Sequence, residues 1–257
     1  MLFVLFVLLM IYLAAASQTI MLHRFASHEQ FKFRKAAYEK LAWFTVYLTM
    51  GVSFLSPRAY ARLHRAHHAY SDQDKDPHSP HNIRNPVRFL WNQYLEYKKR
   101  RSPDETDEPR FCKNLPTTFL DRWNDNLLRV PILLIWIAIF YWFAPTWYAW
   151  VLFPLVIAIS PVHGFIVNNF AHRFGYRNYE SDDHSTNFTI FKMDALCLGE
   201  CFQNNHHHDP SASNFAHFDG EWDPGYYLLR LLEMCKIVEI KRIGPLQELV
   251  LSEATVA

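Results

Sequence analysis

The chain has 257 residues, half of them hydrophobic, and its 26 Lys and Arg residues nearly balance 25 Asp and Glu residues. A net charge near zero excludes a broad nucleic-acid-binding surface, which depends on an excess of positive charge. The four cysteines form no Cys-x-x-Cys pair and therefore indicate reduced thiols, not a disulfide framework.

The N-terminal stretch, residues 1–22, carries no charged side chain. A helix of this length reaches about 33 Å, enough to cross a bilayer core of ~30 Å. A signal peptide cleaved near Ala14-Ala-Ala-Ser17 is the alternative, but no Lys or Arg precedes the apolar run. We therefore predict a membrane span over residues 1–22.

Two further apolar stretches follow. Residues 130–171 contain no Asp, Glu, Lys or Arg, which is long enough for two spans, 130–144 and 147–168. Pro145, with Trp147 and Tyr148 beside it, indicates a turn at the membrane–water interface. Residues 41–57 are also uncharged, but this run is at the short limit for a span.

The positive charges predict the topology. Every Lys and Arg lies in residues 23–40, 58–129 or 172–257, and positive charge is retained on the cytoplasmic side. Residues 41–57 would then not cross, and would form a re-entrant or interfacial helix. We expect one all-α integral membrane domain over residues 1–257, with about three transmembrane helices and a cytoplasmic helical cap formed by 58–129 and 172–257.

Histidines are grouped in three short motifs. His64, His67 and His68 lie at i, i+3 and i+4, which places them on one face of a helix, and Gln203-Asn-Asn-His206-His207 repeats this spacing with glutamine first. His23 and His28 would be roughly 140° apart on an ideal helix, which favours two metal ions or a frayed helix end over one shared metal. Near the end of the last predicted span, His172 follows Asn168 at i+4.

These motifs together predict a cluster of metal ligands close to span ends on one side of the membrane. The candidate ligands are His23, His28, His64, His67, His68, His172, His206 and His207, with Asn168 and Gln203 as oxygen or water-bridging groups. Zinc would be saturated by half of eight histidines, so the set suits two ions with four or five ligands each. Nitrogen-rich sites with an open position suit iron and oxygen chemistry, among other metals.

The remaining histidines give weaker signals. We expect loop positions for His78, His81, His184 and His217, and a hydrogen-bonded packing role for His163 within a span. His208 is interpreted as a neighbour of the ligands.

The three motifs, written His23-Arg-Phe-Ala-Ser-His28, His64-Arg-Ala-His67-His68 and Gly199-Glu-Cys-Phe-Gln-Asn-Asn-His206-His207, resemble the histidine boxes of the membrane fatty-acid desaturases. The flanks Ala69-Tyr-Ser-Asp-Gln-Asp-Lys-Asp-Pro-His78 and Asn168-Asn-Phe-Ala-His172-Arg-Phe-Gly-Tyr176 are similar to the acyl-CoA desaturase branch. The likeness extends over about residues 5–240 and is to short bacterial members without an extra N-terminal span. Gln203 stands where that branch has histidine.

The resemblance implies insertion of a cis double bond into a saturated acyl chain with two iron ions and O2. It implies an acyl-CoA or acyl-lipid substrate, membrane lipid around the enzyme, and an external electron donor, either ferredoxin or a small cytochrome with its reductase. The eight histidines would ligate iron, Asn168 would hold a water, and Arg62 would lie near the CoA group, although attraction to membrane phosphate is an alternative for Arg62. It also implies an active site on the cytoplasmic side of a bacterial inner membrane.

Two other functions are left open. A hydroxylase of the same di-iron superfamily would share the ligand spacing and differ only in its product. A divalent-metal transporter is less favoured, because transporters place ionisable ligands near the bilayer midplane and the predicted spans contain one histidine, His163.

Overall fold

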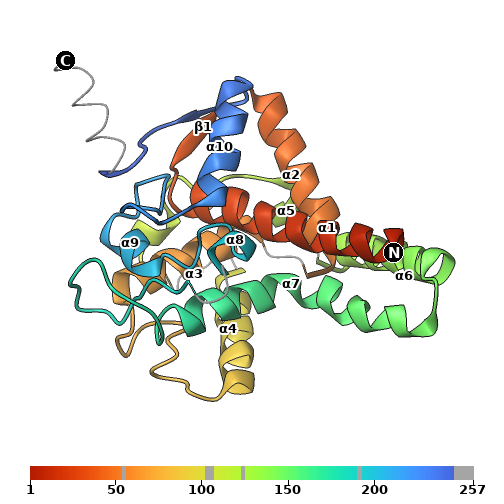
Figure 1. The fold of residues 1–257 in the computed structure, drawn as a ribbon, viewed down its shortest axis with the longest axis horizontal. Helices are drawn as coiled ribbons and strands as arrows, with labels where there is room; N and C mark the ends of the chain where they lie inside the picture. Colours follow the sequence, from red (N-terminus) through yellow and green to blue (C-terminus); the bar gives the residue numbers. More distant parts are fainter. Residues whose placement is uncertain (54–55, 102–106, 123–124, 190–192, 246–257) are drawn as a thin grey trace.

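The computed structural model describes residues 1–53, 56–101, 107–122, 125–189 and 193–245. Three apolar helices lie together and project to one side of the molecule: α1 (Leu2–Ser17), α6 (Asp125–Phe143) and α7 (Phe153–Phe165) (Figure 1). Within the described ranges, the remaining helices and two short strands gather at the other end, in a region that we call the cap (Figure 1). The predicted helical character is confirmed, but the all-α prediction missed the two strands, which pair with each other.

Two helical stretches are long and apolar enough to cross a membrane, Leu2–Ser27 and Trp147–Phe170. They overlap the predicted spans 1–22 and 147–168. The predicted span 130–144 falls in α6, whose apolar section Leu127–Phe143 is shorter. Large apolar side chains on these helices are exposed, including Leu5 at 54% and Val151 at 75%, as expected for surfaces that face lipid. The number of crossings stays a prediction.

The apolar segment 41–57 covers the second half of α2 (Ala36–Met50) and a 3₁₀ turn, Gly51–Ser53, and it ends at the first residue of α3 (Pro57–Tyr70). Residues 54–55 of this segment lie outside the described residues. Figure 1 shows α2 leaving α1 towards the strands instead of following α1 along its whole length. Whether this segment stays on one side of the membrane is still a prediction.

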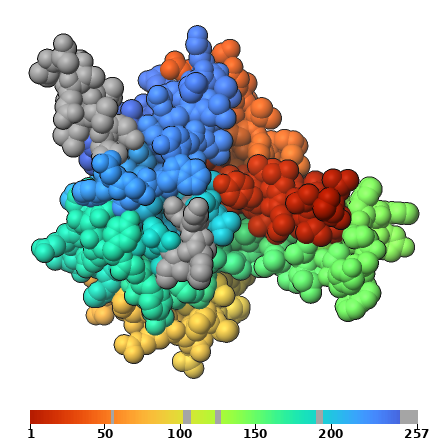
Figure 2. All heavy atoms as spheres, in the orientation of Figure 1, coloured from red at the N-terminus to blue at the C-terminus, as the bar shows by residue number. Residues whose placement is uncertain are grey.

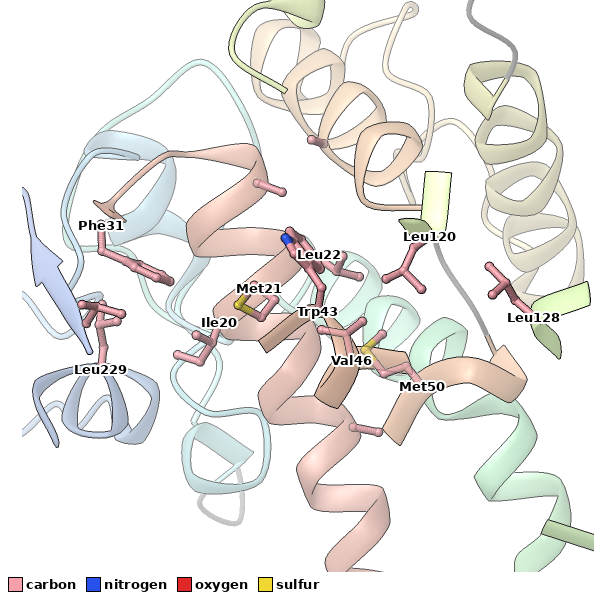
Figure 3. Close-up of a cluster of buried hydrophobic side chains, with 14 residues drawn as sticks. Ile20, Met21, Leu22, Phe31, Trp43, Val46, Met50, Leu120, Leu128 and Leu229 are labelled. Carbon is pink, nitrogen blue, oxygen red and sulfur yellow. The ribbon is translucent and has the colours of Figure 1, made fainter. Parts of the chain in front are cut away.

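An apolar cluster joins the apolar helices to the cap (Figure 3). It brings Ile20, Met21 and Leu22 against Trp43, Val46 and Met50 of α2. Leu120 of α5 (Phe119–Arg122) and Leu229 of α10 (Pro224–Met234) also contribute to it. Each such side chain, once buried, stabilises the fold by roughly 1.5–3 kcal/mol, so this cluster fixes the position of the chain just before the first histidine motif.

Two strands and a buried ion pair tie distant parts of the chain to the same place. β1 (Phe31–Phe33) pairs antiparallel with β2 (Val238–Ile240), with Lys32 opposite Glu239. Arg24, fully buried, donates two hydrogen bonds of 3.0 Å to Asp223, and Asp223 also accepts the backbone N–H of Tyr226 as the N-cap of α10. The first histidine motif is therefore held against the C-terminal part of the described chain.

Candidate metal centre

The first histidine motif lies on a π-helical segment. α1 continues without a break into a π-helix over Gln18–Ser27, and the backbone N–H of His28 donates to the carbonyl of His23 at 3.2 Å. In a π-helix, residues five apart are hydrogen-bonded neighbours, and such segments are frequent at functional sites. The rings of His23 and His28 consequently lie with their centroids 4.9 Å apart. The expected divergence of these two rings was wrong because it assumed α-helical spacing, and the metal that each ring would hold stays a prediction.

The second and third motifs lie on α-helices, as predicted. α3 carries His64, His67 and His68, and its N-terminus is capped by Ser56, whose hydroxyl accepts the Ala59 N–H. The short α9 (Gln203–His208) carries His206 and His207. Each helix divides its histidines between two clusters, since neighbouring residues on a helix point in different directions.

The larger cluster, called here the five-histidine group, contains His23, His28, His64, His68 and His206, with one ligand nitrogen from each within 4.8 Å of the others. The Nε2 atom of His64 lies 2.8 Å from Nε2 of His28 and 2.9 Å from Nε2 of His68. An imidazole nitrogen carries either one hydrogen or one lone pair. His64 Nε2 therefore cannot satisfy both neighbours as donor and acceptor at once, whereas a cation among the rings would satisfy all five.

The smaller cluster, called here the three-histidine group, contains His67, His172 and His207. Their Nε2 atoms are buried and have no hydrogen-bond partner in the described part of the chain. Unsatisfied buried polar atoms are expensive, and three that converge are the donor set of a metal site. The residues of both groups therefore fit metal ions.

Carboxylates hold the outer nitrogens of these rings. Nδ1 of His67 donates to Asp76 at 2.9 Å, Nδ1 of His172 to Asp72 at 2.8 Å, and Nδ1 of His207 to Asp183 at 2.7 Å. Nδ1 of His23 pairs with the buried carboxylate of Glu200. A carboxylate behind a ligand histidine fixes its tautomer and directs Nε2 towards the metal.

The protonation states suit metal binding. Burial, followed by the charges of neighbouring histidines, lowers the pKa of His28, His64, His68 and His206 well below the ordinary value. Burial likewise lowers the pKa of His207 to about 4. These rings are neutral at physiological pH, which is the form that ligates a metal.

The carboxylates stay ionised behind these rings. Burial acts to raise the pKa of Asp72, but the hydrogen bond from His172 and its charge outweigh burial and lower the pKa below its ordinary range. His67 has the same effect on the pKa of Asp76, and His207 on that of Asp183. Ionised carboxylates are acceptors only, so each one holds a hydrogen on the Nδ1 atom that faces it.

The three other predicted site residues are buried. Gln203 donates from Nε2 to the Glu200 carbonyl, and its Oε1 is buried without a hydrogen-bond partner in the described segments. Asn168, on the π-helical segment Ile166–Phe170, lines a cavity together with His64. The Arg62 guanidinium pairs with Asp107 at 2.7 Å and donates to the Arg100 carbonyl at 2.9 Å. Its proposed contact with substrate stays a prediction.

Other histidines differ in part from expectation. His78 follows α3 in a turn, as predicted for a loop, but it is only 3% exposed and its ring packs on His67 with centroids 4.4 Å apart. His217 is similarly buried. His163 is a buried residue of α7, as expected for packing, whereas His208 is exposed and stacks on Tyr179.

The sequence reasoning missed the carboxylates and the buried position of His78. The Asp-rich run before His78, Asp72-Gln-Asp-Lys-Asp76, was the available signal. Nothing local in the sequence marks Asp183 or Glu200, because each reaches its histidine only through the tertiary fold.

A cavity of about 260 Å³ reaches these groups. His64, His78 and Asn168 line it, and its walls come from α3, α4 (Pro86–Arg101), α6 and α7. Apolar side chains including Val52, Leu63, Leu90, Ile157 and Pro161 make up much of this wall. Polar side chains, including Gln93, Arg129 and Ser160, also line it, and a largely apolar surface with some polar groups is usual for a small-molecule site.

The fold and site define a class: a helical protein with apolar, membrane-type helices and two buried histidine clusters, able to hold metal, beside an apolar cavity. A sequence profile of the fatty acid desaturase family matches residues 1–217. The chain belongs to the fatty acid desaturase family, and it is a desaturase enzyme.

Three relatives indicate the breadth of the similarity. Delta-9 desaturase-like 4 protein of Arabidopsis thaliana is 28% identical over 95% of this chain and 78% of its own length. sn-1 stearoyl-lipid 9-desaturase of Anabaena variabilis is 26% identical over 74% of this chain and 65% of its own length. Acyl-CoA C20 Delta5-desaturase of Anemone leveillei is 29% identical over 84% of this chain and 65% of its own length.

Proposed function

We propose that this desaturase inserts a cis double bond into a saturated acyl chain with two iron ions and O2. The observation that carries the proposal is the division of eight histidines into the five-histidine and three-histidine groups, beside a cavity lined by His64. Asn168 and Gln203 add oxygen or water-bridging positions. Iron supplies the oxidising chemistry that an unactivated methylene requires and that side chains cannot provide.

The chain's own residues would bind the acyl chain, orient the ligand histidines and exclude water from the site. The apolar wall of the cavity, which includes Leu63, Leu90 and Ile157, would hold the acyl chain. The carboxylates behind His67, His172 and His207 hold those rings in one orientation. Because both groups are buried, bulk water is kept from the reacting carbon, which suppresses side reactions.

The acyl carrier and the electron donor belong to the same proposal. Named relatives act on a stearoyl lipid in one case and on an acyl-CoA in another, so the carrier here is CoA or a membrane lipid. The donor would be ferredoxin or a small cytochrome with its reductase. The enzyme would sit in a bacterial inner membrane with the histidine groups on the cytoplasmic side, in keeping with two helices long enough to span.

The test is expression in a host that lacks unsaturated fatty acids, followed by lipid analysis and iron determination on the purified protein. We expect unsaturated acyl chains and about two iron ions per chain. His207→Ala, which removes a member of the three-histidine group, should abolish the product and lower the iron content. His208→Ala is the matched control, because His208 is exposed and lies outside both groups. Hydroxylated products, or zinc as the bound metal after growth with iron, would contradict the proposal.

A further inference from the structure

The helix α4 has two unlike faces. Phe89, Tyr97 and Arg100 are buried, whereas Val87 is 75% exposed, Trp91 61% and Leu95 44%. The buried face is fixed to an apolar helix: Phe89 packs edge-on against Phe165 of α7 with ring centroids 5.7 Å apart. The exposed apolar residues therefore belong to a helix that is packed firmly by its other face, so a loosely packed helix does not explain their exposure.

Basic residues flank this apolar face. Arg84, Arg88 and Lys98 are exposed, and none of them forms an ion pair with another described residue. The single acidic residue of α4, Glu96, pairs with Arg100, which belongs to the buried side. The exposed face thus carries Val87, Arg88, Trp91, Tyr94, Leu95 and Lys98 and no acidic residue, and Arg84 lies just before the helix.

The position of α4 places this face beside the apolar helices. Figure 1 shows α4 running across the direction of α7, where the cap meets the apolar helices. In Figure 2, its side chains, in yellow, project from the molecule to one side. A helix that crosses the spans at their cap end lies along the plane of a bilayer that the spans would cross.

We propose that the exposed face of α4 binds an anionic membrane surface. An interfacial helix combines aromatic and aliphatic residues with Lys and Arg on its borders, and both Trp and Tyr favour the headgroup region. Trp91 and Tyr94 pack together with ring centroids 5.5 Å apart. Negative lipid headgroups complement Arg84, Arg88 and Lys98.

This contact would also position the cavity. Tyr94 is 45% exposed and lines the cavity, together with Leu90 and Gln93 of the same helix. The cavity therefore comes close to the protein surface beside α4. Binding of α4 to a membrane would place this end of the cavity next to lipid. The proposal concerns a surface of the cap and does not depend on the reaction that the protein catalyses.

The test measures the depth of α4 in a bilayer. The full chain with Cys112→Ser and Cys235→Ser, which removes the exposed cysteines, carries Trp91→Cys labelled with an environment-sensitive fluorophore. After reconstitution into vesicles of phosphatidylcholine and phosphatidylglycerol, nitroxide-labelled lipids should quench the label strongly. A label on Asp182→Cys, in the exposed loop that follows α7, is the matched control and should stay unquenched. Val87→Cys gives an independent probe of the same face.

The charged border is tested separately. Arg88→Gln and Lys98→Gln should each weaken association of the face with phosphatidylglycerol vesicles about fivefold at low salt. Vesicles of phosphatidylcholine alone should give weaker quenching at position 91. Equal quenching at positions 91 and 182 would overturn the proposal and favour a soluble acidic protein as the occupant of this face. Quenching that is unaffected by lipid charge would overturn the requirement for an anionic surface.

Discussion

At the scale of single residues, the orientation of the histidines depends on carboxylates that do not themselves face the centre. Asp183 illustrates this role. It accepts from His207 Nδ1 and also from the hydroxyls of Ser181 and Ser185, both at 2.6 Å. Two serine hydroxyls therefore fix the Asp183 carboxylate, and this carboxylate fixes the ring of His207. Such hydrogen bonds orient a metal ligand.

The corresponding prediction is that Asp183→Asn lowers iron affinity and desaturase activity by roughly 10–100-fold, because the amide no longer fixes the tautomer of His207. Asp182→Asn, at the neighbouring exposed position, removes the same charge without touching the ring. The measurement is iron content together with product formation in both variants. Equal behaviour of the two variants would show that charge alone, and not the contact with His207, matters.

The sequence was sufficient to identify the candidate histidine ligands but not the carboxylates that orient them. The spacing of His64, His67 and His68 predicts a shared helix, and α3 confirms it, but the spacing does not predict that His67 joins a different group from His64 and His68. Asp183 and Glu200 reach their histidines across contacts between segments far apart in the chain, so no periodicity reports them. His78 was assigned to a loop, and a loop residue becomes buried only when other elements cover it.

At the scale of elements, the π-helical segment explains why one motif was misread. With α-helical geometry, His23 and His28 diverge; with i→i+5 hydrogen bonds they lie in register. The apolar cluster of Figure 3 and the buried pair of Arg24 with Asp223 hold the segment from two sides. Tertiary packing therefore selects the wider helix, and a rule based on local spacing could not anticipate it.

The turn that contains Gly199 gives a prediction at this scale. Gly199 has φ +83°, and a Cβ there would lie 2.2 Å from Asp223 Oδ1. Asp223 cannot move aside easily, because it also accepts from Arg24 and Phe215. We expect Gly199→Ala to destabilise the protein by about 3 kcal/mol or more, since it combines backbone strain, overpacking and disturbance of a buried ion pair.

Gly220 is the matched control. It has φ +87°, but a Cβ there would meet nothing within 4 Å. Gly220→Ala should therefore lose only the ~1–2 kcal/mol of a left-handed alanine. Thermal unfolding of both variants in detergent measures the difference. Equal losses would mean that Asp223 gives way and that the contact between the turn and α10 is not tight.

At the scale of the whole molecule, the sequence predicts an all-α chain whose histidines converge; the structure is mostly helical with one pair of short strands, and the histidines lie in two groups. It could not establish how many helices cross a membrane, because apolar length alone does not separate a crossing helix from an interfacial one. The uncharged segment 41–57 is an example. Most of it belongs to α2, which packs in the apolar cluster of Figure 3 together with residues of the cap.

The predicted topology can be tested with native cysteines. Cys112 and Cys235 are exposed, whereas Cys197 and Cys201 are buried. If residues 23–129 and 172–257 are cytoplasmic, a membrane-impermeant maleimide should label Cys112 and Cys235 only from the cytoplasmic side. Tyr148→Cys, between α6 and α7 and 63% exposed in the native residue, should be labelled only from the opposite side. Labelling of Cys112 from outside would contradict the assignment of segment 41–57 as non-crossing.

The carboxylates behind the histidines have a consequence for the charge of the molecule's interior. All eight proposed ligands are histidines, which bind a metal without adding negative charge, so two ferrous ions would bring four positive charges into a region shielded from water. Asp72, Asp76, Asp183 and Glu200 supply four negative charges directly behind those rings. The assembled centre would be electroneutral although no carboxylate touches iron. Without the ions, the four carboxylates would lose this compensating charge, so completion of the fold around the site should be coupled to metal loading.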